Sequence, residues 1–362
     1  MVDIVAKHGD ANVKQDLNID IIINYNMLRT ILLGVYGVLE EPKPNVVVVG
    51  HGWSGRAFVS NIDASKYNVV VISESGFLDT SRLVSKPGLR SKKLPAGAFK
   101  QAVVTVDPER KFVAAENMTV PYDHLVLACG TVPNTFNIPG VSEHAYFMKT
   151  AADAPKFWEA EWDSVLIVGG GAVGVELAFE VRRQRPSTRV TIVEAAPHML
   201  APYSPAARSL VESELIEHKI QFMKGVPVTE VLADGACSGT THIPAQAVVW
   251  SSGIKVPDWV SAVFGPIHKK LTNFQQVEGV SNVYAIGDLG GPPNAQNAVQ
   301  QGKYLAARFN AGIQAEKTGE PYTYSELAKL VHCGNTIVVD SKWGAFSVPG
   351  WWDPLLRLFY RL

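Results

Sequence analysis

The chain has 362 residues, of which 47% are hydrophobic and 19% are charged, and its formal net charge at pH 7 is −1. This composition is typical of a globular protein with about two or three domains, and it excludes a disordered chain. The near-neutral charge and the lack of a basic stripe argue against nucleic acid as a partner. Cys129, Cys237 and Cys333 form no CxxC pair, so we expect neither a metal site nor a redox disulfide.

An N-terminal extension, residues 1–43, contains one predicted helix. Residues 19–39 are apolar but are interrupted by polar side chains such as Asp20 and Arg29, so this segment does not predict a membrane-spanning helix. Its apolar residues repeat at helical spacing, which predicts an amphipathic helix. Such a helix could pack on its own domain, lie on a membrane surface or dock on a partner protein.

The first glycine-rich turn follows an apolar strand predicted over residues 46–49. The sequence VVVVGHGWSG is followed by a short helix and by a second strand, VVVISE, which ends at Glu74. Irregular sequence fills 76–97, and a hairpin turns at Asp107 and Pro108. Another buried strand closes on Gly130.

A second copy of this pattern begins at Ser164. The sequence VLIVGGGAVGVE is followed by a helix that ends before Pro186 and by the strand VTIVE, which ends at Glu194. A helix over 208–217 and the strand AVVW follow, and this unit closes at Gly253. A carboxylate about twenty residues beyond a strand, a glycine turn and a helix is typical of dinucleotide binding. Two copies predict two dinucleotides held close together, as in flavoproteins that pass hydride from a nicotinamide to a flavin.

The chain then returns to the first unit. The strand NVYAIGD ends at Asp288, and Asn294 begins a helix. We therefore predict an α/β fold with two Rossmann-like domains, the second inserted into the first. The predicted domains are 44–150 with 254–310, and 151–253, followed by a C-terminal region, 311–362. That region is rich in tryptophan near Arg357 and Arg361, which suits a membrane or partner contact, although a buried lid is the alternative.

Four blocks carry a resemblance to a known family. They are GHGWSG at 50–55, YDHLVLACGTVPNTFNIPGV at 122–141, IVGGGAVGVELA at 167–178 and YAIGDLGGPPNAQNAVQQGKYLA at 284–306. The chain resembles the type II NADH dehydrogenases, which are single-subunit flavoenzymes that oxidise NADH and reduce quinone at a membrane surface. The resemblance implies FAD and NADH as cofactors, quinone as acceptor and a peripheral place on the mitochondrial inner membrane.

The same resemblance assigns cofactor-binding residues. For FAD these are Gly50, Gly52, Gly55, Glu74, Gly130 and Asp288. For NADH they are Gly169, Gly171, Gly174, Glu194 and Gly253. Glycine suits a phosphate turn because backbone N–H groups can approach the ligand, and Glu194 is placed to accept hydrogen bonds from ribose and to repel a 2′-phosphate. The alternative is that these glycines serve only the close packing of helix and strand.

Three residues are expected in the catalytic region. Glu176 matches a glutamate that the family places near the nicotinamide and the flavin, although a carboxylate at a helix N-terminus also interacts with the helix dipole. Gln296 and Gln300 are one helical turn apart and match glutamines that line the quinone site. The alternative for these two is a pair of ordinary surface amides.

One stretch departs from the family pattern. Between Glu74 and the hairpin near Val104 the sequence is shorter than in typical members, and a helix that helps to wall the flavin is expected to be missing. This departure supports a second hypothesis, a catalytically weakened paralogue that serves as an accessory subunit of a mitochondrial respiratory complex.

Overall fold

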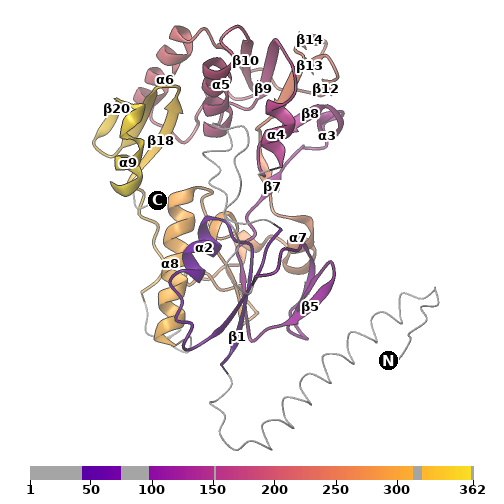
Figure 1. Cartoon of the computed structure of the whole chain (residues 1–362), viewed down its shortest axis with the longest axis vertical. Coiled ribbons are helices and arrows are strands. Elements are labelled where there is room, and N and C mark those ends of the chain that lie inside the picture. Colours follow the sequence, from indigo (N-terminus) through magenta and orange to yellow (C-terminus); the bar gives the residue numbers. More distant parts are fainter. Residues whose placement is uncertain (1–42, 75–97, 151, 313–319, 360–362) are drawn as a thin grey trace, which may run out of the picture.

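The computed structural model describes residues 43–74, 98–150, 152–312 and 320–359 (Figure 1). The helix expected within 1–43 and the irregular stretch 76–97 therefore lie outside the described residues. The described chain forms two α/β units, one above the other in Figure 1, and a small C-terminal sheet beside the upper unit.

The first unit is built on a parallel sheet with the strand order β17-β6-β1-β2. These strands are β1 (Asn45–Val49), β2 (Asn68–Ile72), β6 (His124–Leu127) and β17 (Val283–Ala285). The run of valines in β1 is buried on both faces: Val46 and Val48 face one core, and Val47 and Val49 face another. Such continuous burial explains why the strand sequence is apolar throughout rather than alternating.

Helices cover one face of this sheet. Helices α2 (Trp53–Val59) and α8 (Ala295–Ala311) pack together, and a Cβ atom at Gly302 would lie 2.4 Å from the carbonyl oxygen of Ser54, so glycine permits their close approach. The other face carries α7 (Asp258–Phe264), the 3-10 turn η2 (Ile267–Lys269) and an antiparallel meander. The meander strands are β3 (Val103–Asp107), β4 (Phe112–Ala115) and β5 (Met118–Pro121), which confirms the predicted hairpin.

The second unit has a parallel sheet with the order β11-β10-β9-β15-β8. Its strands are β8 (Ala145–Phe147), β9 (Ser164–Val168), β10 (Arg189–Glu194), β11 (Gln221–Lys224) and β15 (Ala247–Trp250). Its helices are α3 (Val141–His144), α4 (Asp153–Trp158), α5 (Ala172–Gln184) and α6 (Pro205–Glu217), and a second meander joins β12 (Glu230–Leu232), β13 (Gly235–Ser238) and β14 (Thr241–Pro244). Strand β8 lies before residue 151 and yet pairs with β15, so the predicted start of this unit is several residues too late.

The chain crosses between the units twice, and the crossings run side by side. Strand β7 (Val132–Pro133) leaves the first unit and β16 (Ile254–Lys255) returns to it, and the two are antiparallel partners. The returning chain adds β17 to the first sheet beside β6. The insertion of one Rossmann-like unit into another, predicted from the two glycine turns, is thus visible in the strand pairing.

The C-terminal region forms a third sheet rather than an unstructured tail. Strands β18 (Ala328–Cys333), β19 (Thr336–Ser341) and β20 (Gly344–Pro349) are antiparallel neighbours, and η5 (Gly350–Trp352) and α9 (Asp353–Phe359) follow. Val331, Cys333 and Val338 share a core with residues of the second unit, and β18 packs on α5. Trp343 and Trp351 are 76% and 72% exposed, so these two tryptophans do not form a buried lid.

Candidate functional site

The first glycine turn, between β1 and α2, has three glycines with three different surroundings. Gly50 has a φ of +99°, and a Cβ atom there would lie 2.4 Å from the carbonyl oxygen of Ala128. A Cβ at Gly55 would lie 2.2 Å from the carbonyl oxygen of Gly50. Gly52, in contrast, has no atom within 4 Å of its Cβ position. Two glycines thus serve the packing of the turn, and the middle one faces open space where a ligand can approach the backbone.

The second turn, between β9 and α5, repeats this arrangement. Gly169 has a φ of +113°, and its Cβ position lies 2.9 Å from the carbonyl oxygen of Ser251. A Cβ at Gly174 would lie 2.1 Å from the carbonyl oxygen of Gly169, whereas the Cβ position of Gly171 again has nothing within 4 Å. Packing alone explains the first and third glycines, but it does not explain the middle glycine of either turn.

Glu194 lies at the end of β10 beside the second turn. Its Oε2 accepts a hydrogen bond from the backbone N–H of Gly170 at 2.7 Å, and its Oε1 accepts one from Ala196 at 2.8 Å. The side chain is partly buried, and each carboxylate oxygen keeps a second lone pair. The carboxylate is therefore held at the position from which the ribose of a bound dinucleotide is usually recognised.

The other predicted residues, Glu74, Gly130 and Gly253, each follow the carboxyl end of a parallel strand: β2, β6 and β15 respectively. Gly130 has a φ of +68° and open space at its Cβ position. Gly253 has a φ of +70° and lies under the ring of Phe136, which would be 2.4 Å from a Cβ atom. Glu74 is exposed just beyond β2, at the end of the described segment. A larger residue at Gly253 would displace Phe136.

Asp288 lies in η3 (Gly287–Leu289), directly after β17, in a polar network that the sequence motifs did not reveal. Its Oδ2 accepts a hydrogen bond from the hydroxyl of Thr131 at 3.0 Å. The ammonium group of Lys149 donates to the same hydroxyl at 3.1 Å and lies 3.8 Å from Asp288. The network joins the chain after β6 and β17, at the carboxyl ends of the first sheet, to the chain after β8 of the second sheet. Open α/β sheets bind their ligands at the carboxyl ends of their strands.

His51 lies inside the first turn and is 8% exposed. Within the part of the chain that the structure describes, its Nδ1 atom has no hydrogen-bond partner. Burial, assisted by the positive charge of Arg56, lowers the pKa of His51, so the imidazole is neutral at pH 7. A buried polar atom without a partner is unusual, and its position beside the open face of Gly52 fits a turn that is completed by a bound polar group.

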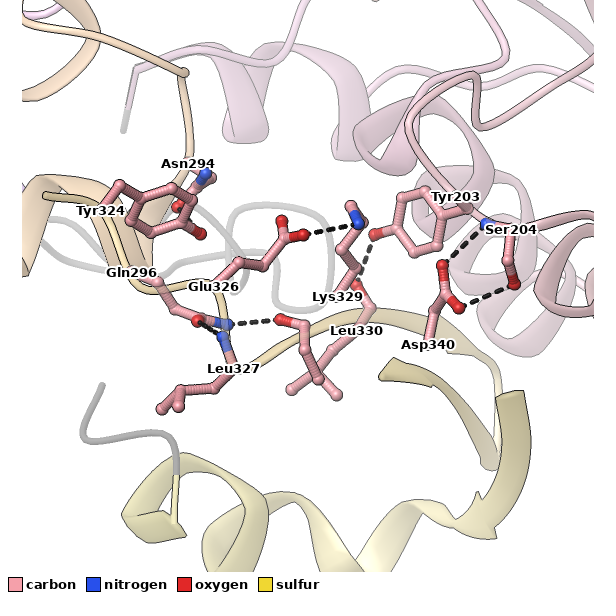
Figure 2. Close-up of polar contacts among 11 residues, drawn as sticks. Tyr203, Ser204, Asn294, Gln296, Tyr324, Glu326, Leu327, Lys329, Leu330 and Asp340 are labelled. Carbon is pink, nitrogen blue, oxygen red and sulfur yellow. Dashed lines mark hydrogen bonds and ion pairs between the residues drawn. The ribbon is translucent and has the colours of Figure 1, made fainter. Parts of the chain in front are cut away.

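Gln296 and Gln300 share a face of α8, as predicted, and both contact the segment 325–328; Figure 2 shows the contacts of Gln296. Gln296 donates to the carbonyl of Ala328 and accepts from the N–H of Leu327 at 3.3 Å. Gln300 donates to the carbonyl of Ser325 at 2.8 Å and accepts from its N–H at 3.1 Å. Both side-chain amides therefore bind the backbone that leads into β18.

Glu176 is the fifth residue of α5, and its side chain contacts β18. Its Oε1 accepts a hydrogen bond from the backbone N–H of His332 at 3.1 Å and lies 3.0 Å from Nδ1 of the same residue. The other ring nitrogen of His332 lies 3.0 Å from Oδ1 of Asp353. Burial alone would lower the pKa of His332, but the hydrogen bonds to Asp353 and Glu176 outweigh it and raise the pKa to about 9.

One segment, Ser325 to His332, thus contacts all three residues that the sequence placed in the catalytic region. A cavity of 390 Å³ lies alongside this segment, between it and the second unit. Tyr203, Ser204 and Asp340 line that cavity; Ser204 donates to Asp340 at 2.7 Å, and Tyr203 donates to the carbonyl of Leu330 at 2.9 Å (Figure 2). No sequence motif marks His332 or Asp353, because each acts through a partner that is distant in the chain.

No helix among the described residues is both long enough and apolar enough to span a bilayer. Charged and polar residues interrupt the longer ones, α5, α6 and α8.

These two turns and the fold around them define a class. The family model described as pyridine nucleotide-disulphide oxidoreductase matches residues 44–302, and the chain belongs to this family. The resemblance to type II NADH dehydrogenases is confirmed by the relatives. The chain is 27% identical over 319 residues to the external alternative NAD(P)H-ubiquinone oxidoreductase B2 of Arabidopsis thaliana mitochondria, a match that covers 68% of this chain and 54% of that protein.

Further comparisons agree. The internal alternative NAD(P)H-ubiquinone oxidoreductase A1 of Solanum tuberosum mitochondria is 27% identical over 392 residues, with 84% of this chain and 78% of that protein covered. A solved structure of NDH2 from Plasmodium falciparum in complex with NADH superposes with a TM-score of 0.77 at 19% identity, covering 88% of this chain and 94% of that one. The predicted fold class is therefore confirmed. The chain spans about half the length of the Arabidopsis relative.

Proposed function

We propose that this chain is a flavoprotein that oxidises NADH and passes the electrons to a quinone. The observation that carries this proposal is the open face of the middle glycine in each of two equivalent turns. We assign residues 44–150 and 254–310 to a flavin domain, except that strand β8 joins the inserted NADH domain, which otherwise comprises 151–253. Relatives named as NAD(P)H-ubiquinone oxidoreductases support the same activity.

The second turn and Glu194 form the proposed NADH site. The turn leads into α5, a helix of 13 residues, and the free N–H groups at its start favour the pyrophosphate. Glu194 accepts hydrogen bonds from the ribose hydroxyls and repels a 2′-phosphate, which favours NADH over NADPH. We assign Gly253 to the nicotinamide side of this site. It has no side chain, and the ring of Phe136 occupies the space that a side chain would take.

The first turn, together with Asp288, Lys149 and His51, forms the proposed FAD site. Gly52 leaves room for the diphosphate, and we assign Asp288, which accepts a hydrogen bond from Thr131, to the ribityl part of the cofactor. His51 supplies a buried ring nitrogen that still lacks a partner among the described residues. FAD held here would supply the redox chemistry that links NADH oxidation to quinone reduction. The chain itself needs only to hold the two rings close together and to exclude water.

Quinone as acceptor is supported by Gln296 and Gln300, since an amide can donate to a quinone carbonyl without bringing charge into an apolar site. Both amides now bind the backbone of 325–328. Quinone binding at these residues therefore requires Gln296 to exchange the carbonyl of Ala328 for that of the quinone. This exchange takes the Gln296 donor away from the carbonyl of buried Ala328, so the contact with the quinone has to offset that loss.

A peripheral place on the mitochondrial inner membrane is supported by the exposed aromatic side chains of the C-terminal region. Trp343, Trp351 and Phe346 are each at least 47% exposed, and tryptophan is favoured at the level of lipid headgroups. The relatives named above are mitochondrial. We expect vesicles of inner-membrane lipid composition to retain the protein and to lose it when Trp343 and Trp351 are replaced by alanine. Equal retention of this variant would contradict the assignment.

Flavin reconstitution tests the main proposal. Purified protein is incubated with FAD and passed through a desalting column, and anaerobic NADH is then added. We expect yellow absorbance that NADH bleaches and a soluble quinone restores. Protein that stays colourless after incubation with FAD would overturn the proposal.

An accessory-subunit role is the second candidate. It is favoured by the contacts that occupy the polar atoms of Glu176, Gln296 and Gln300 with the protein's own backbone and side chains. In that case the nucleotide sites would serve structure, and the chain would co-purify with a respiratory complex. Quinone reductase turnover by the isolated chain would exclude this candidate.

A further inference from the structure

His332 forms a bridge between two carboxylates from distant parts of the chain. Its Nδ1 lies 3.0 Å from Glu176 of α5, and its Nε2 lies 3.0 Å from Asp353, the first residue of α9. The side chains of His332, Glu176 and Asp353 are 31%, 13% and 26% exposed, so the bridge is partly shielded from solvent. The backbone N–H of His332 also donates to Glu176, which fixes the carboxylate from two directions.

The chemistry of the bridge requires a charged imidazole. Ionised carboxylates only accept hydrogen bonds, so the ring can donate to both partners only when both of its nitrogens carry a proton. Glu176 on α5 and Asp353 on α9 are the charged groups that act on His332, and the charge of Glu176 also acts on Cys333 of β18 and on Tyr203 before α6. Burial, followed by the charges of Glu214 and Glu176, raises the pKa of the Cys333 thiol, and burial, followed by the charge of Glu176, raises that of Tyr203, so both stay neutral at pH 7.

The two carboxylates of the bridge lie in different regions of the chain, Glu176 beside the second glycine turn and Asp353 at the start of α9. Glu176 follows the second glycine turn by two residues and lies at the proposed nicotinamide end of the NADH site. Asp353 follows directly on Trp351 and Trp352, which are exposed and contact one another at 5.7 Å between ring centres. A side chain that holds both carboxylates therefore links the hydride-transfer region to the exposed end of the C-terminal region.

We propose that His332 is a positioning residue that couples the docking of α9 to the placement of Glu176. This inference rests on the proposed function, because it takes Glu176 as part of the NADH site. When Asp353 leaves Nε2, the imidazole loses one of its two fixed contacts, and Glu176 is then held firmly only by the backbone N–H of His332. Because coupling is reciprocal, NADH bound beside Glu176 stabilises the docked α9.

Hydrogen exchange and kinetics on the FAD-reconstituted full chain test this coupling. We expect saturating NADH to slow amide exchange in residues 344–356 at least threefold in the wild type. His332→Gln keeps a donor near the Nε2 position, toward Asp353, but loses the contact with Glu176. In this variant we expect exchange without NADH to remain close to wild type and the NADH effect to vanish. The kcat of flavin reduction should fall about fivefold with little change in KM.

A double-mutant cycle separates coupling from local damage. Glu176→Gln and Asp353→Asn should each lower the kcat of flavin reduction, and the double variant should be no slower than the slower single variant. Multiplied effects in the double variant, or an NADH effect on 344–356 that persists in His332→Gln, would overturn the inference. Asp234→Asn is the matched control, because Asp234, in the exposed turn between β12 and β13, pairs with His242 of β14 at 3.4 Å. It should change neither measurement.

The same experiments separate this inference from the proposed function. A wild-type chain that does not bind NADH contradicts the proposed function. In such a chain Glu176→Gln must still speed exchange in 344–356, because the bridge itself does not depend on the nucleotide. A wild-type chain that binds NADH while exchange in 344–356 is unaffected, both by NADH and by Glu176→Gln, contradicts only the coupling.

Discussion

Gln300 and Ser325 form a reciprocal pair of hydrogen bonds, with the amide of Gln300 donating at 2.8 Å and the backbone N–H of Ser325 donating back at 3.1 Å. A side chain here imitates the pairing of neighbouring β-strands. Gln296 repeats the arrangement one helical turn earlier with Leu327 and Ala328. Residues that the family resemblance assigns to a quinone site thus hold the entry to β18 in this conformation.

Replacing both Gln296 and Gln300 by alanine should release this entry segment. Each amide makes two hydrogen bonds to the backbone, so we expect the free energy of unfolding to fall by about 1–3 kcal/mol. Chemical denaturation measures this loss, and hydrogen exchange of 320–330 should rise. Lys303→Ala, an exposed change on the same helix, is the control and should leave both unchanged. Unaltered exchange in the double variant would show that the segment is held by other contacts.

Alanine at Gly52 and at Gly55 should have opposite effects. Gly52 has a φ of −74° and open space at its Cβ position, so Gly52→Ala should fold with wild-type stability and lose FAD, because the methyl group fills the space above the turn. Gly55→Ala places a methyl group 2.2 Å from the carbonyl oxygen of Gly50 and should destabilise the first unit. Thermal unfolding and flavin absorbance separate the two outcomes. Retention of FAD by Gly52→Ala would place the cofactor elsewhere.

Glu194→Ala tests the ribose assignment. Loss of hydrogen bonds to a charged group costs about 1.5–3 kcal/mol, so we expect NADH affinity to fall roughly 10- to 100-fold, with a much smaller change for NADPH. Isothermal titration with each nucleotide measures both constants. Glu230→Ala, on the exposed face of β12 in the same unit, should leave both constants unchanged. If affinity for the two nucleotides is the same in Glu194→Ala as in the wild type, the carboxylate does not bind ribose.

Alkaline pH should weaken the attachment of the C-terminal sheet. The pKa of His332 is raised in the folded protein from its ordinary value of 6.5 to about 9, so its stabilising contribution is fully present below pH 6.5 and is lost as pH rises through 9. We expect the midpoint of thermal unfolding to fall over this range in the wild type. The fall should be smaller in His332→Gln, whose amide does not titrate. Parallel curves for the two proteins would show that the bridge adds no pH-dependent stability.

The two sheets could be predicted from the sequence because their signals are local. A run of valines that ends in a glycine turn predicts a parallel strand buried on both faces of the sheet, with the turn at the carboxyl edge of that sheet. Asn294 predicts a helix start because asparagine is a favoured N-cap residue, and its side chain accepts a hydrogen bond from the N–H of Asn297, within one turn. Features of this kind need no knowledge of the rest of the chain.

The partners of the predicted site residues could not be predicted, because they depend on tertiary contacts. Glu176 and His332 are 156 residues apart, and Thr131 and Asp288 are 157 apart. No period or motif connects them. The strands β18 to β20 could not be predicted either. Their aromatic and polar residues are compatible with a membrane-facing tail as well as with a sheet that packs one face on α5 and α6.

The late arrival of β17 beside β6 has a consequence for biosynthesis. Val283 pairs with Leu125, so the first sheet lacks its fourth strand until the ribosome has made the whole inserted unit. The inserted sheet, by contrast, has all of its strands between Ala145 and Trp250. We therefore expect the interior unit to mature before the one that encloses it, and a nascent chain halted before Val283 to expose the edge of β6 to chaperones.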